Sequence, residues 1–233
     1  MAQNPANRPD HIEEVDQMTD LHWEHPTGRV PESVLIVALG PSKLDLLELT
    51  TAHEPPAEVM DVDEVWGLNA GCNHLAGRVG YDVLWVMDLL ECEERKWPRY
   101  GESLRRWQQR FAGPIITSDA GYWIDDYNVH EYPLEWVCKR TAPADPYFHN
   151  SIPYLLAYAL AIGVKRIALF GADYSHEASK RREDDRPNAE YWIGFCQARG
   201  VQFILPPTTT LLNANRRGWF YGYRDQPRLA DLT

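Results

Sequence analysis

The sequence lacks the features that define several large classes of protein. Its four cysteines are dispersed and form no CxxC pair, so neither a zinc site nor a disulfide framework is indicated. This cysteine usage favours a reducing, cytoplasmic setting. No apolar run approaches the length that crosses a bilayer, and the polar N-terminus lacks the pattern of a signal peptide. We therefore expect a soluble, unexported protein with no membrane span.

Positive charge is scarce as well. Lys and Arg number 23 against 34 Asp and Glu, and the net charge of -11 disfavours a protein whose whole surface binds nucleic acid. The phosphate-binding fingerprints GxGxxG and GxxxxGK[ST] do not occur. His22 and His25 form an HxxH pair without further ligands placed beside it, so we expect a loop or surface role rather than metal binding.

What the chain does contain is a series of short apolar runs that alternate with helical segments. With 233 residues, of which 44% are hydrophobic, it can form one α/β domain with a substantial core. Buried parallel strands have continuous apolar sequences, whereas helices are longer and periodic. Strands are expected at 33–39, 62–68, 81–87, 114–117, 164–170 and 201–205, and helices at 44–49, 91–111, 152–162 and 188–199.

The segments outside this alternation divide the chain. Residues 1–31, with four prolines, should be a flexible tail or a strap over a domain that spans 32–212. Residues 122–146, rich in aromatics, Asp and Pro, predict an irregular lid insertion with a short strand near 129–132. The mixed charges of 176–186 are typical of a solvated, mobile loop or of a lid. The basic and aromatic arm at 213–233 either packs across the domain or contacts nucleic acid.

Small and polar residues follow the expected strands. Gly40, Pro41 and Ser42 come after the first strand, Asn69 after the second, and Asp88 after the third. In an open α/β sheet, ligands bind at these carboxyl ends. The Gly-Pro-Ser turn can offer backbone N–H groups and a helix dipole to a phosphate, with Ser42 as a cap, or it is a plain tight turn. Asn69 and Asp88 suit helix caps equally well.

The segment from Ile152 to Phe170 is the plainest helix, turn and strand in the chain, with Gly163 ending the helix. Its strand leads directly into Gly171 and Asp173, which therefore belong to the same expected ligand-binding edge.

Three features in this order resemble a known family. They are the strand and turn from Val34 to Ser42, the Asn69 that follows the second strand, and the ALAIGVKRIALFGADY stretch from Ala159 to Tyr174. Together with the ending ILPPTTTLLNAN, Ile204 to Asn215, they resemble bacterial sialyltransferases that use a cytidine-monophosphate sugar. A related Rossmann-like group has a similar turn and helix–strand element: the 6-hydroxymethylpterin pyrophosphokinases and the motility-associated glycosyl transfer factors.

The resemblance implies a Rossmann-like α/β fold, with a mostly parallel sheet flanked by helices. It also implies a metal-independent transfer from a nucleotide-sugar donor, with no cofactor required. Gly40, Pro41, Ser42 and Asn69 would then hold the nucleotide phosphate and ribose. Further donor contacts are implied for Asn150, Ser151, Thr208 and Thr209, and Tyr147 lies near the tyrosines that assist the departing phosphate.

The catalytic histidine of that family has no direct equivalent here. Its position falls near Arg181, whereas the nearest histidine is His176 in the charged segment. His149, directly before Asn150, is the second candidate for a general base.

The leading prediction is a nucleotide-sugar-dependent glycosyltransferase, in which His176 or His149 deprotonates an acceptor hydroxyl while the nucleotide leaves. The alternative enzyme is a Mg²⁺-dependent pyrophosphokinase or another nucleotide-dependent transferase, with Asp88, Asp119 and Asp173 holding the ion. A third alternative is a non-catalytic nucleotide or nucleic-acid-binding module that uses the C-terminal arm.

Overall fold

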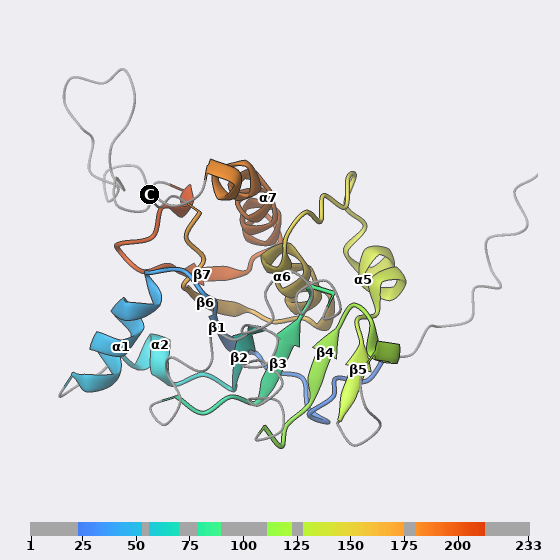
Figure 1. The fold of residues 1–233 in the computed structure, drawn as a ribbon, viewed down its shortest axis with the longest axis horizontal. Helices are drawn as coiled ribbons and strands as arrows, with labels where there is room; N and C mark the ends of the chain where they lie inside the picture. The colour runs from blue at the N-terminus through green and yellow to red at the C-terminus, as the bar shows by residue number, and fades with distance from the viewer. Residues whose placement is uncertain are drawn as a thin grey trace, which may run out of the picture.

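A computed structural model describes residues 23–52, 56–69, 79–89, 111–122, 128–174 and 180–212. Within them, seven strands form one sheet in the order β5-β4-β3-β2-β1-β6-β7 (Figure 1). Every neighbouring pair is parallel. The strands are β1 (Ser33–Val37), β2 (Glu64–Leu68), β3 (Val83–Val86), β4 (Ile115–Thr117), β5 (Val129–Glu131), β6 (Arg166–Phe170) and β7 (Gln202–Ile204).

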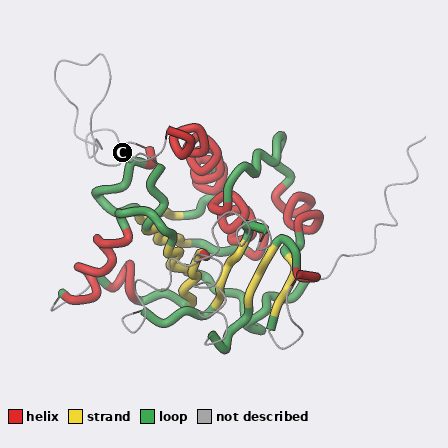
Figure 2. Tube along the Cα trace, viewed as in Figure 1, coloured by secondary structure: helices red, strands yellow, loops and turns green. Residues whose placement is uncertain are grey.

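Helices cover both faces of this sheet (Figure 2). Successive side chains of a strand point to opposite faces, so one strand supplies two cores. In β1, Val34 and Ile36 pack into the larger core, and Leu35 and Val37 into the smaller one. The described helices are α1 (Lys43–Thr51), α2 (Ala57–Met60), the 3-10 turn η2 (Ala120–Tyr122), α5 (Leu134–Thr141), α6 (Ser151–Ile162) and α7 (Lys180–Gln197).

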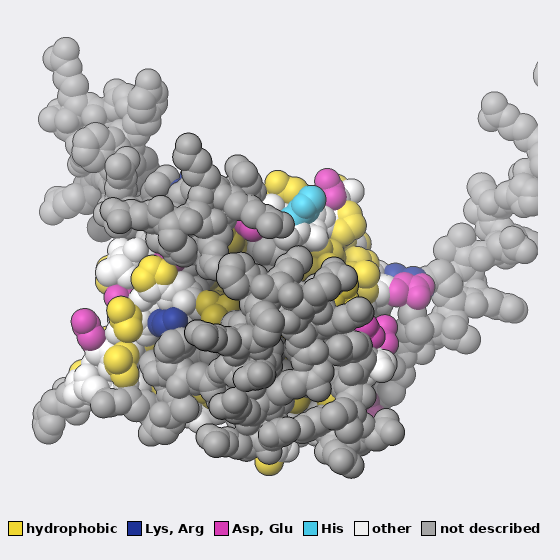
Figure 3. Space-filling view, viewed as in Figure 1, with side chains coloured by type: hydrophobic (Ala, Val, Ile, Leu, Met, Phe, Trp, Pro, Cys, Tyr) yellow, Lys and Arg dark blue, Asp and Glu magenta, His cyan; other side chains and the backbone are white. Residues whose placement is uncertain are grey.

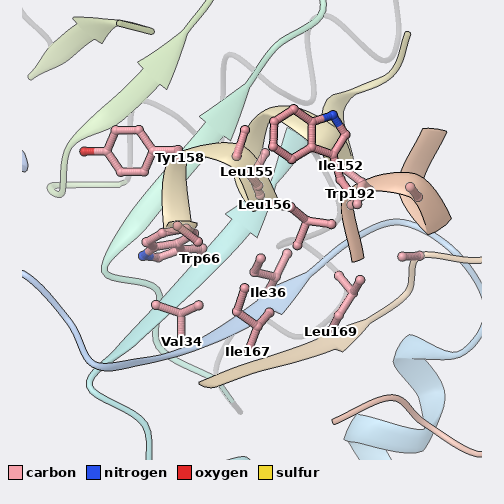
Figure 4. Packing of buried hydrophobic residues seen from close by; sticks show 14 of the residues in the cluster. Val34, Ile36, Trp66, Ile152, Leu155, Leu156, Tyr158, Ile167, Leu169 and Trp192 are labelled. Carbon is pink, nitrogen blue, oxygen red and sulfur yellow. The ribbon is translucent and has the colours of Figure 1, made fainter. Parts of the chain in front are cut away.

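The larger core lies between the sheet and helices α6 and α7. Figure 4 shows Trp66 of β2 and Ile167 of β6 on the side of the sheet that faces Leu155 and Tyr158 of α6. Trp192 of α7 joins the same cluster. Burial of such large side chains contributes about 1.5–3 kcal/mol each, so this layer is the main stabilising contact of the domain. The smaller core, on the other face, takes Leu46 from α1 and Val59 from α2.

The predicted fold class, a mostly parallel Rossmann-like α/β sheet flanked by helices, is confirmed, and each predicted strand is present within a few residues of its expected bounds. The short strand predicted near residue 129 is β5, but the helix α5 that follows it was not predicted. Residues 180–186 were expected to be loop and instead belong to α7, because Glu, Lys and Arg are good helix formers. Pro187 lies inside that helix, so Asn188 is not its cap.

Residues 23–31 form a strap against the amino ends of the strands. His25 is buried there, in a loop, rather than exposed. Its ring nitrogens lie 2.7 Å from the Tyr158 hydroxyl and 2.9 Å from Glu64 Oε2. Trp23 Nε1 donates to the same Tyr158 hydroxyl oxygen at 2.9 Å. This network joins the strap to β2 and α6 at the edge of the sheet opposite to the strands' carboxyl ends.

Candidate functional site

The strand order has one point at which the chain reverses its direction of progress across the sheet. From β1 the chain adds β2 to β5 on one side and then returns to place β6 and β7 on the other. Such a topological switch point leaves a crevice outside the carboxyl ends of the two central strands, and ligands of open α/β proteins bind there. In this chain the switch point lies between β1 and β6, whose exits carry the Gly-Pro-Ser turn and the Gly171–Asp173 segment.

Two glycines allow these exits to approach closely. The Gly40 N–H donates to the Gly171 carbonyl oxygen at 2.6 Å. A Cβ on Gly40 would lie 2.6 Å from Asp173 Oδ2, and a Cβ on Gly171 would lie 2.4 Å from the Ala38 carbonyl oxygen. Gly171 also has φ +74, a conformation that non-glycine residues adopt only with strain. Neither position has room for a side chain.

Ser42 and Asp173 stabilise the Gly-Pro-Ser turn through buried hydrogen bonds to the exit of β6. The Ser42 N–H donates to Asp173 Oδ2 at 2.6 Å, and the Gly171 N–H donates to the Ser42 hydroxyl oxygen at 3.0 Å. Ser42 occupies the N-cap position of α1, as predicted, but its side chain makes no capping hydrogen bond. Its hydroxyl instead holds the β6 exit, and both Ser42 and Asp173 are buried.

A cavity of about 230 Å³ opens directly beside this turn. Seven of the predicted site residues line it: Gly40, Asn69, Asp88, Asn150, Ser151, Gly171 and Asp173. They come from the ends of β1, β2, β3 and β6 and from the start of α6. The remaining lining residues are Ala38, Leu39, Leu68, Ile152, Ala172, Tyr174 and Asp185. The structure thus brings together residues that lie up to 147 positions apart in the chain, from Ala38 to Asp185.

Asn69 and Asp88 form a pair on one side of the cavity. Asn69 Nδ2 donates to Asp88 Oδ2 at 2.6 Å, so the two strand ends are bonded to each other. Asn69 is buried and has φ 49, a left-handed conformation that Asn adopts more readily than most residues. The polar residue at this position therefore also lets the backbone turn sharply after β2.

The amino end of α6 forms another side of the cavity. Asn150 is the N-cap, and its Oδ1 accepts the Ile152 N–H at 3.2 Å and the Tyr174 hydroxyl at 2.8 Å. Its Nδ2 donates to the Asp185 carbonyl oxygen at 3.0 Å, which ties α6 to α7. An α-helix carries partial positive charge at this end, so α6 favours an anionic group in the cavity.

Asp173 retains one unused acceptor. Its Oδ1 is buried and has no hydrogen-bond partner among the described residues. A buried carboxylate oxygen without a partner is costly, and a ligand hydroxyl or amino group would satisfy it.

Other predicted residues lie outside the cavity lining. Tyr147, at φ 43, packs its ring against His149 and Tyr191, with ring centroids 5.2 and 5.8 Å away. His149 is exposed. Thr208 donates to Asp45 Oδ2 at 2.6 Å and Thr209 is buried, so both lie at the exit of β7 beside α1.

Three further predicted residues lie away from the cavity lining or outside the described residues. Pro41 is exposed, within the turn but not in the lining. Asp119 is exposed after β4 and does not join Asp88 and Asp173. His176 lies outside the described residues, as do residues 1–22 and the C-terminal arm at 213–233.

Two observations concern metal binding and membrane-spanning segments. Within the described ranges, no group of three or more His, Cys, Asp or Glu side chains is arranged to hold a metal ion. No helix among the same residues has the length and hydropathy of a membrane-spanning segment.

The fold places the chain in the Rossmann-like α/β class. No protein-family model matches it, and no curated protein matches it by sequence. A solved structure of the sialyltransferase CstII from Campylobacter jejuni, in complex with the substrate analogue CMP-3FNeuAc, is similar with a TM-score of 0.45 and 15% identity, covering 76% of this chain and 81% of that one. A mutant of the α-2,3/8-sialyltransferase CstII gives a TM-score of 0.47 and 14% identity, with 76% and 83% covered. Likeness of this degree does not define a family.

Proposed function

We propose that the protein is a nucleotide-sugar-dependent glycosyltransferase with its donor site in the cavity at the switch point. The observation that carries this proposal is the convergence of Gly40, Asn69, Asn150 and Asp173 on one cavity at the carboxyl edge of the sheet. Parallel α/β sheets bind nucleotides at this place. Gly40, Asn69 and Asp173 also belong to the motifs by which the sequence resembles the sialyltransferases.

The polar groups of the cavity suit the parts of a nucleotide sugar. The buried Oδ1 of Asp173, which has no hydrogen-bond partner among the described residues, would accept a hydrogen bond from a ribose hydroxyl or a base amino group. The amino end of α6, with Ser151 in the lining, favours the phosphate. The volume of about 230 Å³ is smaller than the roughly 300–1,000 Å³ of pockets that enclose whole drug-sized ligands. The cavity therefore encloses the nucleotide in part, and the sugar extends outside it toward the acceptor.

In the proposed reaction an acceptor oxygen attacks the anomeric carbon of the donor sugar. The new C–O bond forms as the bond from that carbon to the phosphate oxygen breaks, and the phosphate keeps the electron pair. The acceptor proton passes to a general base, for which His149 and His176 are the candidates. The protein contributes position and charge stabilisation to this step.

A metal-dependent phosphoryl or pyrophosphoryl transfer is the second candidate, and one observation favours it. The cavity lining includes Asp88, Asp173 and Asp185, although within the described residues no three acidic side chains are grouped so as to hold a metal ion by themselves. Carboxylate oxygens are the side-chain ligands that Mg²⁺ prefers, together with substrate phosphates. The two candidates differ in what a chelator does to turnover.

The test is the release of nucleotide from cytidine, uridine and guanosine nucleotide sugars, measured with excess chelator and with Mg²⁺. We expect one donor to be consumed at the same rate under both conditions, and Asn69→Asp to lower that rate at least tenfold. Lys139→Met is the control, because Lys139 is an exposed residue of α5 that pairs with Glu135. Consumption of none of the donors would overturn the proposal, and Mg²⁺-dependent consumption of a nucleoside triphosphate in their place would favour the second candidate.

A further inference from the structure

The cavity has a charge imbalance for a site that holds a phosphate. Its lining includes three aspartates and contains neither Lys nor Arg. Few Lys and Arg atoms show among the coloured side chains on the face drawn in Figure 3. Phosphates in proteins are bound by Lys, Arg or clusters of backbone N–H groups. The amino end of α6 supplies only partial positive charge, so a phosphate next to these carboxylates needs a further donor or a cation.

The backbone of the Gly-Pro-Ser turn does not supply that donor. The Gly40 N–H donates to the Gly171 carbonyl oxygen at 2.6 Å, and the Ser42 N–H to Asp173 Oδ2 at 2.6 Å. Pro41 has no N–H, and the Lys43 N–H donates to the Gly40 carbonyl oxygen at 3.3 Å. The expectation that this turn presents its N–H groups to a phosphate is not met by its geometry, because these groups bond within the protein.

The side chain of Lys43 lies where the missing charge is needed. Its Nζ donates to the carbonyl oxygen of Leu39 at 2.7 Å, and Leu39 lines the cavity. Partial burial lowers the pKa of Lys43, and the nearby Asp173 carboxylate opposes that shift. An ammonium group has three N–H donors, so two remain after the bond to Leu39. Lys43 is thus a partly buried cation at the rim of an acidic cavity.

We propose that the Lys43 ammonium group binds the phosphate of the nucleotide and stabilises it as it leaves. The inference rests on the proposed donor site and adds a residue to it. Lys43 lies on the first turn of α1, where its Nζ donates to the Leu39 carbonyl oxygen and interacts electrostatically with the Asp173 carboxylate. A phosphate that enters the cavity would accept hydrogen bonds from the two remaining N–H groups of Lys43, and the ammonium charge would offset part of the negative charge of the phosphate and the three aspartates.

A purely structural role for Lys43 makes a different prediction. The bond from Nζ to Leu39 could serve only to hold the end of β1 against α1. In that case removal of the charge would affect the stability of the fold and would leave the contribution of the phosphate to ligand affinity unchanged. Lys43→Gln separates the two roles, since it keeps an N–H donor for Leu39 on a side chain one atom shorter but removes the charge.

The experiment measures the affinity of each of four nucleosides and of its 5′-monophosphate, by calorimetry in chelator at neutral pH. The ratio of the two affinities reports the contribution of the phosphate. We expect Lys43→Gln and Lys43→Met to reduce this ratio about 10- to 100-fold, as for a lost hydrogen bond to a charged group, and Lys43→Arg to retain most of it. Lys165→Met is the control, because Lys165 is exposed just before the amino end of β6, at the opposite edge of the sheet.

Each outcome decides between the proposals. A wild-type ratio that survives in both neutral variants would overturn the role of Lys43 while leaving the donor site in place. A wild-type protein that binds neither nucleosides nor nucleotides would overturn the donor site, and this inference with it. If Lys43→Met does not fold, Lys43→Gln and the recovery by Lys43→Arg still decide the question.

Discussion

The close approach of the β1 and β6 exits can be tested by Gly171→Ala. Gly171 has φ +74, and a Cβ there would lie 2.4 Å from the Ala38 carbonyl oxygen and 2.7 Å from its carbonyl carbon. These are backbone atoms at the end of the central strand, so they cannot move aside as a flexible side chain would. The substitution therefore combines two costs, backbone strain and a steric clash.

Gly163→Ala isolates the first of these costs. Gly163 ends α6 with φ +95, and no atom lies within 4 Å of the Cβ that Ala would add. A left-handed conformation costs a non-glycine residue about 1–2 kcal/mol. Forcing extra volume into a packed region costs about 1–3 kcal/mol more. We expect Gly163→Ala to lower the free energy of unfolding by the first amount and Gly171→Ala by the sum, about 2–5 kcal/mol.

Urea denaturation of both variants at 25 °C, followed by tryptophan fluorescence, measures this difference. Nucleotide binding provides a second measurement, since only Gly171 lines the cavity. We expect Gly163→Ala to bind as the wild type does and Gly171→Ala to bind more weakly. Equal unfolding free energies for the two variants would refute the argument that the exits are in contact.

Three further predictions concern stability and the cavity wall. Burial would raise the pKa of the Glu64 carboxyl, but hydrogen bonds from His25, Thr27 and Trp66 together lower it below its ordinary 4.5. Glu64 therefore stabilises the fold above pH 4.5 and loses this contribution as the pH falls through its lower folded pKa. Glu64→Gln should flatten the dependence of the unfolding free energy on pH in this range. An unchanged dependence would count against this role of Glu64. Tyr158→Phe removes the partner of His25 Nδ1 and the acceptor of Trp23 Nε1, and it should cost about 1–3 kcal/mol in urea denaturation with nucleotide affinity unchanged. Asn150→Ala removes the cap of α6 and should cost about 0.5–2 kcal/mol and weaken nucleotide binding, whereas a loss of stability alone would remove Asn150 from the site.

The sheet could be predicted from the sequence because each of its strands is a short run of residues that can be recognised without knowledge of the rest of the chain. The run from Ser33 to Val37 is apolar at nearly every position and fully buried, as expected of a central parallel strand. Gly163 predicted the end of α6, and it adopts the left-handed conformation of a C-cap. The start of α7 was missed because the mixed charges of residues 176–186 are compatible with both exposed helices and loops.

The cavity could be predicted in part for a similar reason. Residues that directly follow a strand are placed by the strand itself, so Gly40, Asn69, Asp88 and Asp173 meet at one edge. Asp185 was missed, because its position depends on how α7 packs against α6 through Asn150. Tyr147 follows no strand, and its ring packs on Tyr191 rather than into the cavity. The partners of the turn's N–H groups could not be predicted either, since Asp173 lies 131 positions from Ser42.

The most direct test of the donor site is calorimetric titration of cytidine, uridine, guanosine and adenosine monophosphates into the wild type and Asn69→Asp, in chelator. The substitution replaces the Asn69 amide that donates to Asp88 with a further carboxylate beside Asp88 in the cavity wall. We predict that the wild type binds one nucleotide selectively and that Asn69→Asp binds it at least tenfold more weakly. Absence of binding by the wild type, or equal affinity in the variant, would contradict a nucleotide site at the switch point.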